Sequence, residues 1–187
     1  MRLATGNPHK LREYSALLEG LELGGLPDAF EMPPEDGESF AENALIKARA
    51  LALATGEQSI ADDSGICVER LDGKPGIRSA RWAGEDATDE ENLELLLEST
   101  EPGDRLEYVC VIAWVDPASG GEETFEGRCS GVRAAEPRGT GGFGYDPAFE
   151  PEEEPGRTMA ELEPGEKDAI SHRGKAARAF SEWLARR

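Results

Sequence analysis

The sequence has few of the residues that build disulfide frameworks or soft-metal centres. It contains three cysteines and two histidines in 187 residues. Cys67, Cys110 and Cys129 are odd in number, widely spaced and without a Cys-x-x-Cys pair, so we predict small core residues rather than disulfides or a zinc site. With His9 and His172 as the available imidazoles, a transition-metal centre is disfavoured. Oxygen ligands suited to Mg²⁺ or Mn²⁺ remain.

Basic residues are also scarce. The chain has 20 Lys plus Arg against 39 Asp plus Glu, which gives a formal net charge of −19 at pH 7. Such a surface repels nucleic acid and anionic membranes, so we expect neither as a partner. An anionic substrate would bind only where basic residues or a divalent cation reverse the local field. Any phosphate site should therefore be compact.

Long apolar runs are absent too. No stretch approaches the 18 or more apolar residues of a membrane span, and the segment 1–5 lacks the apolar region of a secretion signal. We therefore expect a soluble protein in the reducing cytoplasm. The length of 187 residues favours one domain over 1–187, with an active-site cleft between two lobes.

The apolar pattern predicts an α/β fold with a central mixed, twisted sheet flanked by helices. Capping boxes at Ser39 and Thr88 each precede a helix, and the first of these helices should end at Gly56. The expected elements are a strand at 1–4, a helix carrying Leu11, Tyr14, Leu17 and Leu18, a helix at 40–55, a strand around 59–68, a helix carrying Leu93, Leu96 and Leu97, a hairpin over 106–132 and a closing helix from about Gly174.

Asp62 and Asp63 interrupt an apolar run and are the most informative pair of residues. On an extended backbone, adjacent side chains point to opposite faces, so one carboxylate could bind a metal while the other acts on water. The alternative is that Asp62-Asp63-Ser64-Gly65 is an ordinary turn between two strands.

Thr5-Gly6-Asn7-x-x-Lys10 lies where the first strand passes into a helix. Backbone N–H groups and the helix dipole favour a phosphate at such a place. The spacing fits neither a P-loop nor a Rossmann motif, and Gly and Asn also occur in such turns for geometry alone.

Two further residues bear on phosphate and metal binding. Lys47 falls on the Ala-rich helix, where the alternative is a solvated surface lysine. Glu35 lies in a proline-stiffened loop and would complete an all-oxygen metal site with Asp62 and Asp63.

The glycine-rich segment 139–144 and the basic segment 167–175 could bind a planar ligand. Phe143 or Tyr145 offers a ring for stacking, and Asp146 would accept from a base N–H. The alternative is a hairpin turn with core aromatics. His172 and Arg173 could donate to a carbonyl and Lys167 could bind an anion, or Ser171 caps the last helix while the bases are solvated.

These segments, in this order, resemble the inosine triphosphate pyrophosphatase family, also called Ham1-like or non-canonical purine nucleoside triphosphate pyrophosphatases. The resemblance covers almost the whole chain. It rests on these blocks: Ala4-Thr5-Gly6-Asn7-x-x-Lys10, Glu42-Asn43-Ala44-x-x-Lys47-Ala48, Ala61-Asp62-Asp63-Ser64-Gly65, Pro75-Gly76-Ile77-x-Ser79-Ala80-Arg81, Gly141-Gly142-Phe143-Gly144-Tyr145-Asp146-Pro147 and Ser171-His172-Arg173-Gly174.

The resemblance implies Mg²⁺-dependent hydrolysis of ITP, dITP and XTP to the monophosphate and pyrophosphate, a two-lobed α/β fold and a homodimer. It makes Asp63 the general base, with Glu35 and Asp62 completing the metal environment and Asp63 sharing the ion. The implied substrate contacts are Thr5, Asn7, Lys10, Lys47 and Lys167 at the phosphates, Ser64 beside Asp63, Phe143 and Asp146 at the base, and His172 and Arg173 at its 6-oxo group. Gly6, Gly144, Tyr145 and Ser171 are further implied substrate contacts.

Two other functions stay open at this point. One is a Maf-type pyrophosphatase that acts on other modified bases, and the other is a sensor that binds nucleotides without cleaving them. A Nudix hydrolase is disfavoured because no Arg-Glu-x-x-Glu-Glu helix follows a glycine-led segment.

Overall fold

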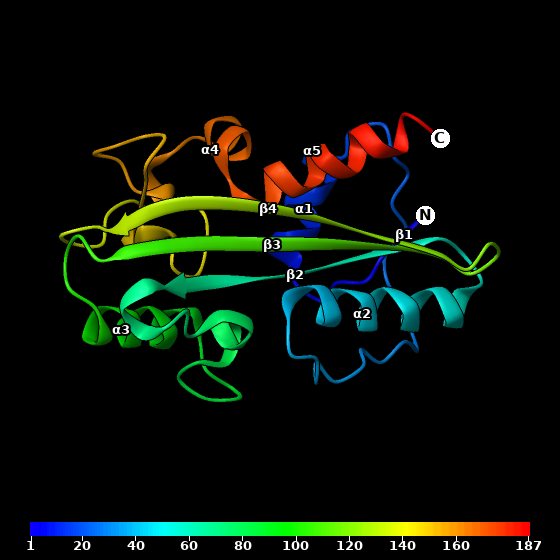
Figure 1. Cartoon of the computed structure of the whole chain (residues 1–187), viewed down its shortest axis with the longest axis horizontal. Helices are drawn as coiled ribbons and strands as arrows, with labels where there is room; N and C mark the ends of the chain where they lie inside the picture. The colour runs from blue at the N-terminus through cyan, green and yellow to red at the C-terminus, as the bar shows by residue number, and fades with distance from the viewer. The chain divides into compact units, whose positions relative to one another are not determined.

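The computed structural model describes all residues, Met1–Arg187. Figure 1 shows strands flanked by helices. The strands are β1 (Arg2–Leu3), β2 (Ser59–Val68), β3 (Arg105–Asp116), β4 (Gly121–Arg133) and β5 (Phe149–Pro151), and the α-helices are α1 (Pro8–Leu17), α2 (Phe40–Thr55), α3 (Asp89–Ser99), α4 (Pro164–Ile170) and α5 (His172–Leu184). Short 3₁₀ helices cover Glu69–Leu71, Gly76–Arg81, Asp146–Ala148 and Met159–Glu161.

The five strands form one sheet in the order β1-β2-β3-β4-β5. The β1–β2 pair is parallel, whereas β4 and β5 are antiparallel. The sheet is therefore mixed, as predicted. The long strands β3 and β4 are joined by a tight turn in which the Gly120 N–H donates to Asp116 O, so the expected hairpin is confirmed.

The chain divides into two compact units, each built from separated segments. Unit 1 comprises Met1–Asp63, Cys110–Gly127 and Lys175–Arg187, and unit 2 comprises Ser64–Val109 and Arg128–Gly174. The strands β2, β3 and β4 each contribute residues to both units.

Unit 1 has a hydrophobic core on each face of its part of the sheet. Ile60, Ile112 and Trp114 pack with residues of α1 and α5, whereas the alternate residues Ala61 and Ala113 pack with α2. The two-residue period of a strand explains this division. In Figure 1, α2 lies on one side of these strands and α1 and α5 lie on the other.

Unit 2 has a single large core. Ile66 and Val68 of β2 and Tyr108 of β3 pack there with Leu96 of α3 and Phe149 of β5. The Thr88 capping box that was predicted for α3 is present, because Thr88 Oγ1 accepts from the Glu91 N–H while the Glu91 side chain accepts from the Thr88 N–H.

The starts of two predicted helices differ from the sequence prediction, and one further helix was not predicted. At α2, Ser39 Oγ accepts from the Glu42 N–H, but the Glu42 carboxylate accepts from the N–H of Glu38, so the expected box is only half formed. The closing helix α5 begins at His172, two residues earlier than expected. Helix α4 was not predicted, although a Glu163–Glu166 capping box and Pro164 in its first turn favour it.

None of the helices has both the length and the apolar character that a membrane span requires. Cys110 and Cys129 are buried, Cys67 is half-buried, and no disulfide joins any two of them.

Candidate active site

Asp62 and Asp63 lie within β2, so the alternative of a turn is wrong. The Asp62 side chain lies on the same face of β2 as Ile60, towards α1, and its Oδ2 forms an ion pair with Lys10 Nζ at 2.8 Å. The Asp63 side chain lies on the same face of β2 as Ala61, towards α2, and its Oδ1 forms an ion pair with Lys47 Nζ at 3.4 Å. The two carboxylates therefore face opposite sides of one strand, as the sequence predicts, and each is paired with a lysine from a different helix.

Lys47 is buried rather than solvated. Only 5% of the residue is exposed, and its ammonium contacts both Glu35 and Asp63. Glu35 in the loop before α2 and Asp63 on β2 therefore contact the same ammonium group, that of Lys47. We call Lys10, Glu35, Lys47, Asp62 and Asp63 the carboxylate-lysine cluster, and all five belong to unit 1.

Burial and charge act against each other in this cluster. Desolvation raises the pKa of Asp63, although the positive charge of Lys47 pulls that pKa down. Desolvation of Lys47 acts to lower its pKa, but Asp63, Asp62 and Glu35 outweigh it, so the pKa of Lys47 is raised and the ammonium stays charged. The cluster therefore combines a held cation with a carboxylate whose proton affinity is increased.

The loop before α1 is ordered by its own side chains. Asn7 is the N-cap of α1, and its Oδ1 accepts from the N–H groups of His9 and Lys10 at 2.8 and 3.3 Å. Thr5 Oγ1 accepts from the Asn7 N–H at 3.2 Å. Gly6 is exposed, and a Cβ added there would meet no atom within 4 Å. Thr5 and Asn7 therefore fix the geometry of this turn, which was one of the two expectations for it. The turn leads into α1, the helix that carries Lys10.

The three acidic residues supply oxygen donors of the kind that Mg²⁺ prefers. In this structure the lysines, rather than a shared metal position, hold the carboxylates, and no group of three or more acidic, histidine or cysteine side chains is arranged as a metal site. The donor chemistry of Glu35, Asp62 and Asp63 fits the ion.

In unit 2, Asp146 organises the glycine-rich loop. Its Oδ2 accepts from Lys167 Nζ at 2.7 Å and from the Phe143 N–H at 2.9 Å, while its Oδ1 accepts from Tyr108 Oη at 3.2 Å. Gly142 has φ +69°, and a Cβ there would come within 2.0 Å of Asp146 Oδ2. Only glycine therefore lets the loop close over this carboxylate.

Basic side chains surround the Phe143 ring. Lys167 Nζ and Arg173 Cζ lie 5.2 and 5.6 Å from the ring centre. Lys167, His172 and Arg173 are each at most 7% exposed, so the alternative that these basic side chains are solvated is wrong. We define an aromatic-basic cluster in unit 2 that consists of Tyr108, Phe143, Asp146, Lys167, His172 and Arg173.

The remaining predicted residues of unit 2 have partners that fix their positions. Arg173 Nη2 donates to Ser64 Oγ at 3.0 Å, which links this cluster to the residue after Asp63. Ser171 Oγ accepts from the Gly174 N–H and caps α5, as one of our alternatives had it. The Gly144 N–H donates to Asp89. Tyr145 is a core residue whose hydroxyl donates to Ser79 O, although the segment forms no hairpin.

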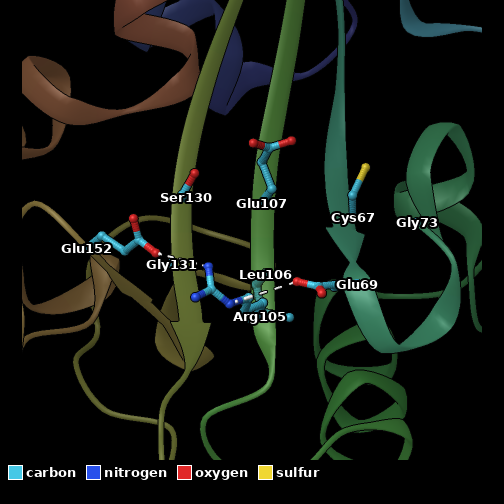
Figure 2. A pocket seen from close by; sticks show the side chains of 9 residues that line it. All are labelled: Cys67, Glu69, Gly73, Arg105, Leu106, Glu107, Ser130, Gly131 and Glu152. Atoms are coloured by element: carbon cyan, nitrogen blue, oxygen red, sulfur yellow. Dashed lines mark ion pairs between the residues drawn. The ribbon is translucent and has the colours of Figure 1, made fainter.

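A separate pocket lies on unit 2. It encloses about 260 Å³, and Figure 2 shows Arg105 in it between Glu69 and Glu152, with closest N···O distances of 3.9 and 3.8 Å. No residue of either cluster lines this pocket. Its one lining arginine is thus already paired with acidic neighbours, and the predicted chemistry lies elsewhere.

Asn43, which contacts the carboxylate-lysine cluster, and Tyr108, which belongs to the aromatic-basic cluster, were not assigned a role from the sequence. Asn43 is fully buried and joins the loop to β2, because its Oδ1 accepts from the Gly37 N–H while its Nδ2 donates to Asp63 at 3.2 Å. A signal was available, since asparagine is a poor helix former and this one stands four residues before Lys47 in an Ala-rich helix. Tyr108 reads as an ordinary strand residue, so pattern alone could not single it out.

The fold defines an α/β protein with a mixed, helix-flanked sheet, and each of its two units carries a buried cluster of acidic and cationic side chains. Comparison with known proteins makes this class specific. The model of the Ham1 family matches residues 1–183, and the chain belongs to the Ham1 family.

Relatives and solved structures agree with this assignment. A "dITP/XTP pyrophosphatase" of Corynebacterium diphtheriae is 48% identical over 98% of this chain and 95% of its own length, and one of Cutibacterium acnes is 50% identical over 95% and 92%. The structure of a HAM1 protein from Coxiella burnetii has a TM-score of 0.89 at 40% identity, covering 100% of this chain and 98% of that one. The predicted family and fold class are thus confirmed.

Proposed function

We propose that this protein hydrolyses non-canonical purine nucleoside triphosphates, namely ITP, dITP and XTP, to the monophosphate and pyrophosphate. The observation that carries the proposal is the pair Asp62 and Asp63, which present carboxylates to opposite sides of β2 and each meet a lysine. The names of the relatives, dITP/XTP pyrophosphatase, support the same reaction.

In the proposed reaction, water attacks the α-phosphorus of the bound nucleotide. Asp63 accepts a proton from that water, the new P–O bond forms at the α-phosphorus, and the bond to the bridging oxygen of the β-phosphate breaks. Pyrophosphate leaves with the bonding electrons. A carboxylate held beside the phosphate-binding lysines is a suitable general base for that water.

Lys10, Lys47 and the N-terminal loop of α1 would bind the triphosphate. Both ammonium groups are held in place by carboxylates in this structure, and they would exchange part of that pairing for phosphate oxygens. The family resemblance assigns Lys167 to the phosphates as well. Here its ammonium is paired with Asp146, so that contact would require the pair to open.

Glu35, Asp62 and Asp63 would supply the oxygen donors for the divalent ion, and because Asp62 and Asp63 face opposite sides of β2, binding one ion to both would require their lysine pairs to open. Bound Mg²⁺ would neutralise charge on the phosphates and on the leaving pyrophosphate. Mn²⁺ satisfies the same oxygen-donor preference and is the expected substitute.

The aromatic-basic cluster would recognise the base. Phe143 would stack on the purine, and His172 and Arg173 would donate to its 6-oxo group. Adenine would aim an amino group at these donors and leave buried polar groups unpaired, which is a strong basis for rejection.

Three wider features belong to the same proposal. We propose that residues 1–187 act as one pyrophosphatase domain, that the protein forms a homodimer and that it works in the cytoplasm. The near-complete coverage of the relatives supports the first, and the family resemblance alone supports the other two.

The test is a product assay across nucleoside triphosphates with Mg²⁺. Purified protein should release pyrophosphate, and no orthophosphate, from ITP, dITP and XTP, with much slower turnover of ATP. Release of orthophosphate from the same substrates would contradict the cleavage position.

The same panel separates the alternatives. Preferred turnover of dTTP, UTP or 7-methyl-GTP would favour a Maf-type enzyme. Binding of ITP without any product would favour a sensor. A chelator such as EDTA should abolish turnover, and added Mg²⁺ should restore it.

A further inference from the structure

Tyr108 is a buried tyrosine that the proposed reaction does not use. It lies on β3 between Glu107 and Val109, is only 6% exposed, and belongs to the core of unit 2. A tyrosine buried for its apolar surface alone would need only some hydrogen-bond partner for its hydroxyl. The partners of Tyr108 are instead two of the residues to which we assign recognition of the base.

The hydroxyl of Tyr108 meets Asp146. It donates to Oδ1 at 3.2 Å, whereas Lys167 and the Phe143 N–H both donate to Oδ2. The carboxylate is thus held from both of its oxygens, which prevents rotation about its terminal bond. Burial and the nearby Asp146 charge raise the pKa of Tyr108 far above its ordinary value, so its hydroxyl keeps the proton that it donates.

The ring of Tyr108 meets His172. The two rings are stacked with centroids 4.6 Å apart and planes only 10° from parallel. The other aromatic neighbour, Phe149, lies 4.4 Å away at 32° and supports the tyrosine ring from the core. The plane of the imidazole is therefore set by a rigid strand residue, and with it the directions in which the ring nitrogens point.

We propose that Tyr108 is a positioning residue for base discrimination, holding the Asp146 carboxylate through its hydroxyl and the His172 plane through its ring. This inference rests on the proposed function. It adds that the selectivity of the site depends on a residue that does not itself contact the nucleotide.

The chemistry of the purines explains why such positioning would discriminate. Hypoxanthine and xanthine carry a proton on N1 and an oxygen at C6, whereas adenine has an unprotonated N1 and an amino group at C6. A fixed carboxylate accepts a hydrogen bond from the N1–H of hypoxanthine or xanthine, and it repels the N1 lone pair of adenine. A carboxylate free to rotate would lose part of this difference.

The experiment compares Tyr108→Phe with the wild-type protein, using ITP and ATP as substrates in the presence of Mg²⁺. This change removes one oxygen and keeps the ring. We expect the ITP-over-ATP ratio of kcat/KM to fall about tenfold, the value of one charge-assisted hydrogen bond, mostly through a higher KM for ITP. The control is Tyr14→Phe, another buried tyrosine, whose hydroxyl meets Cys110 in unit 1. It should leave the ratio unchanged.

A double-mutant cycle tests whether Tyr108 acts through Asp146. In an Asp146→Asn background, Tyr108→Phe should cause little further loss of the ratio, because the acceptor that it positions is already altered. Tyr108→Leu removes the ring as well, and it should lower the ratio further than Tyr108→Phe does. Independent losses in the cycle would overturn the positioning role.

The failure of this inference can be told from failure of the proposed function. If wild-type protein releases no pyrophosphate from ITP, the proposed function is wrong. If it does, and Tyr108→Phe keeps the wild-type ratio, the inference is wrong while the function stands. Should Tyr108→Phe lower the folded yield, the increase in Tm caused by ITP relative to that caused by ATP gives the same comparison on the folded fraction, and an unchanged difference again overturns the inference.

Discussion

At the scale of single residues, the chain keeps charged groups in the protein interior by pairing them. Lys47 is the central example, because Glu35 and Asp63 both contact one buried ammonium. Removing one partner from a buried ion pair leaves a charge without compensation, which costs far more than the pair itself gains. The cluster is therefore sensitive to loss of its cation.

We predict that Lys47→Met destabilises the fold by about 3 kcal/mol, because Glu35 and Asp63 would face each other without the ammonium. Chemical denaturation measures this loss. The exposed Lys74→Met is the control and should stay within about 0.5 kcal/mol of wild type. Equal stability of the two variants would mean that Lys47 is not needed to hold these carboxylates.

We predict that Asp63→Asn lowers pyrophosphate release from ITP by about 10²- to 10⁴-fold, because an amide cannot accept the proton of the attacking water. Binding of ITP, followed by calorimetry, should persist. Asp86→Asn, at an exposed position, serves as control and should be fully active. Near-normal turnover of Asp63→Asn would remove Asp63 from the role of base.

Most residues of the candidate site could be proposed from sequence, but their pairings could not. The alternation of a strand was enough to place Asp62 and Asp63 on opposite faces. The burial of Lys47 depends on which helix packs on which face, and that is a tertiary property. Tyr108 shows the limit most clearly, since its partners His172 and Asp146 lie 64 and 38 positions away in the sequence.

At the scale of elements, strand β2, which carries Asp62 and Asp63, is packed closely against the 3₁₀ helix Gly76–Arg81. A Cβ at Gly65 would lie 2.4 Å from both Gly76 O and Ser79 Oγ. Ser79 Oγ also accepts from the Ile66 N–H at 2.8 Å, so this contact fixes β2 immediately after Asp63 and Ser64.

We predict that Gly65→Ala lowers stability by about 1–3 kcal/mol through overpacking, and that it also lowers activity because the strand must shift beside Asp63. Thermal unfolding and pyrophosphate release measure the two effects. Gly25→Ala is the matched control, since an added Cβ there meets nothing within 4 Å. Wild-type behaviour of Gly65→Ala would show that the strand adapts without cost.

The first turn of α4 gives a pH-dependent prediction. Hydrogen bonds from Arg157 and from the Glu163 N–H lower the pKa of Glu166 to about 2, below its ordinary 4.5. A lowered pKa means that the ionised carboxylate stabilises the fold above pH 4.5, and that this stabilisation is lost as the pH falls through about 2.

We therefore predict that Glu166→Gln lowers Tm at pH 7 and that the difference from wild type shrinks between pH 4.5 and pH 2. Scanning calorimetry at several pH values measures it. Glu182→Gln on α5, which removes an exposed carboxylate, is the control for the change in net charge. A Tm difference that stays constant down to pH 2 would contradict the assignment.

The elements themselves were predicted unevenly. The helices α2 and α3 begin at capping residues that the sequence displays, and β3 and β4 follow β-branched patterns. Helix α4 was missed because Pro164 and Gly165 resemble a turn. The start of α5 was placed late because Gly174 resembles a helix boundary, whereas a Cβ there would lie 1.9 Å from Asp168 O, so a close contact requires glycine inside the helix.

At the scale of the whole molecule, the net charge of −19 should influence stability. Mutual repulsion of the acidic residues opposes the compact state, and salt screens it. The exposed ion pairs act in the opposite direction, but each contributes only about 0–1 kcal/mol.

We predict that Tm at pH 7 rises when ionic strength increases from about 0.01 M to about 0.15 M, as the Debye length falls from roughly 30 Å to 8 Å. Near pH 4.5, the calculated isoelectric point, the same change should have little effect because the net charge is close to zero. Thermal melts in sodium chloride at both pH values measure this. A falling Tm at pH 7 would mean that ion pairs outweigh the repulsion.

The segmented origin of the two units has a consequence for protein engineering. Unit 2, which holds the groups assigned to base recognition, consists of two stretches separated by strand residues of unit 1. Exchanging one contiguous gene fragment with a homologue therefore cannot replace unit 2 alone, because a fragment that covers both stretches also carries Cys110–Gly127 of unit 1. A working chimaera would need both stretches, joined inside β2, β3, β4 and the first turn of α5, without altering the alternation of the strand side chains.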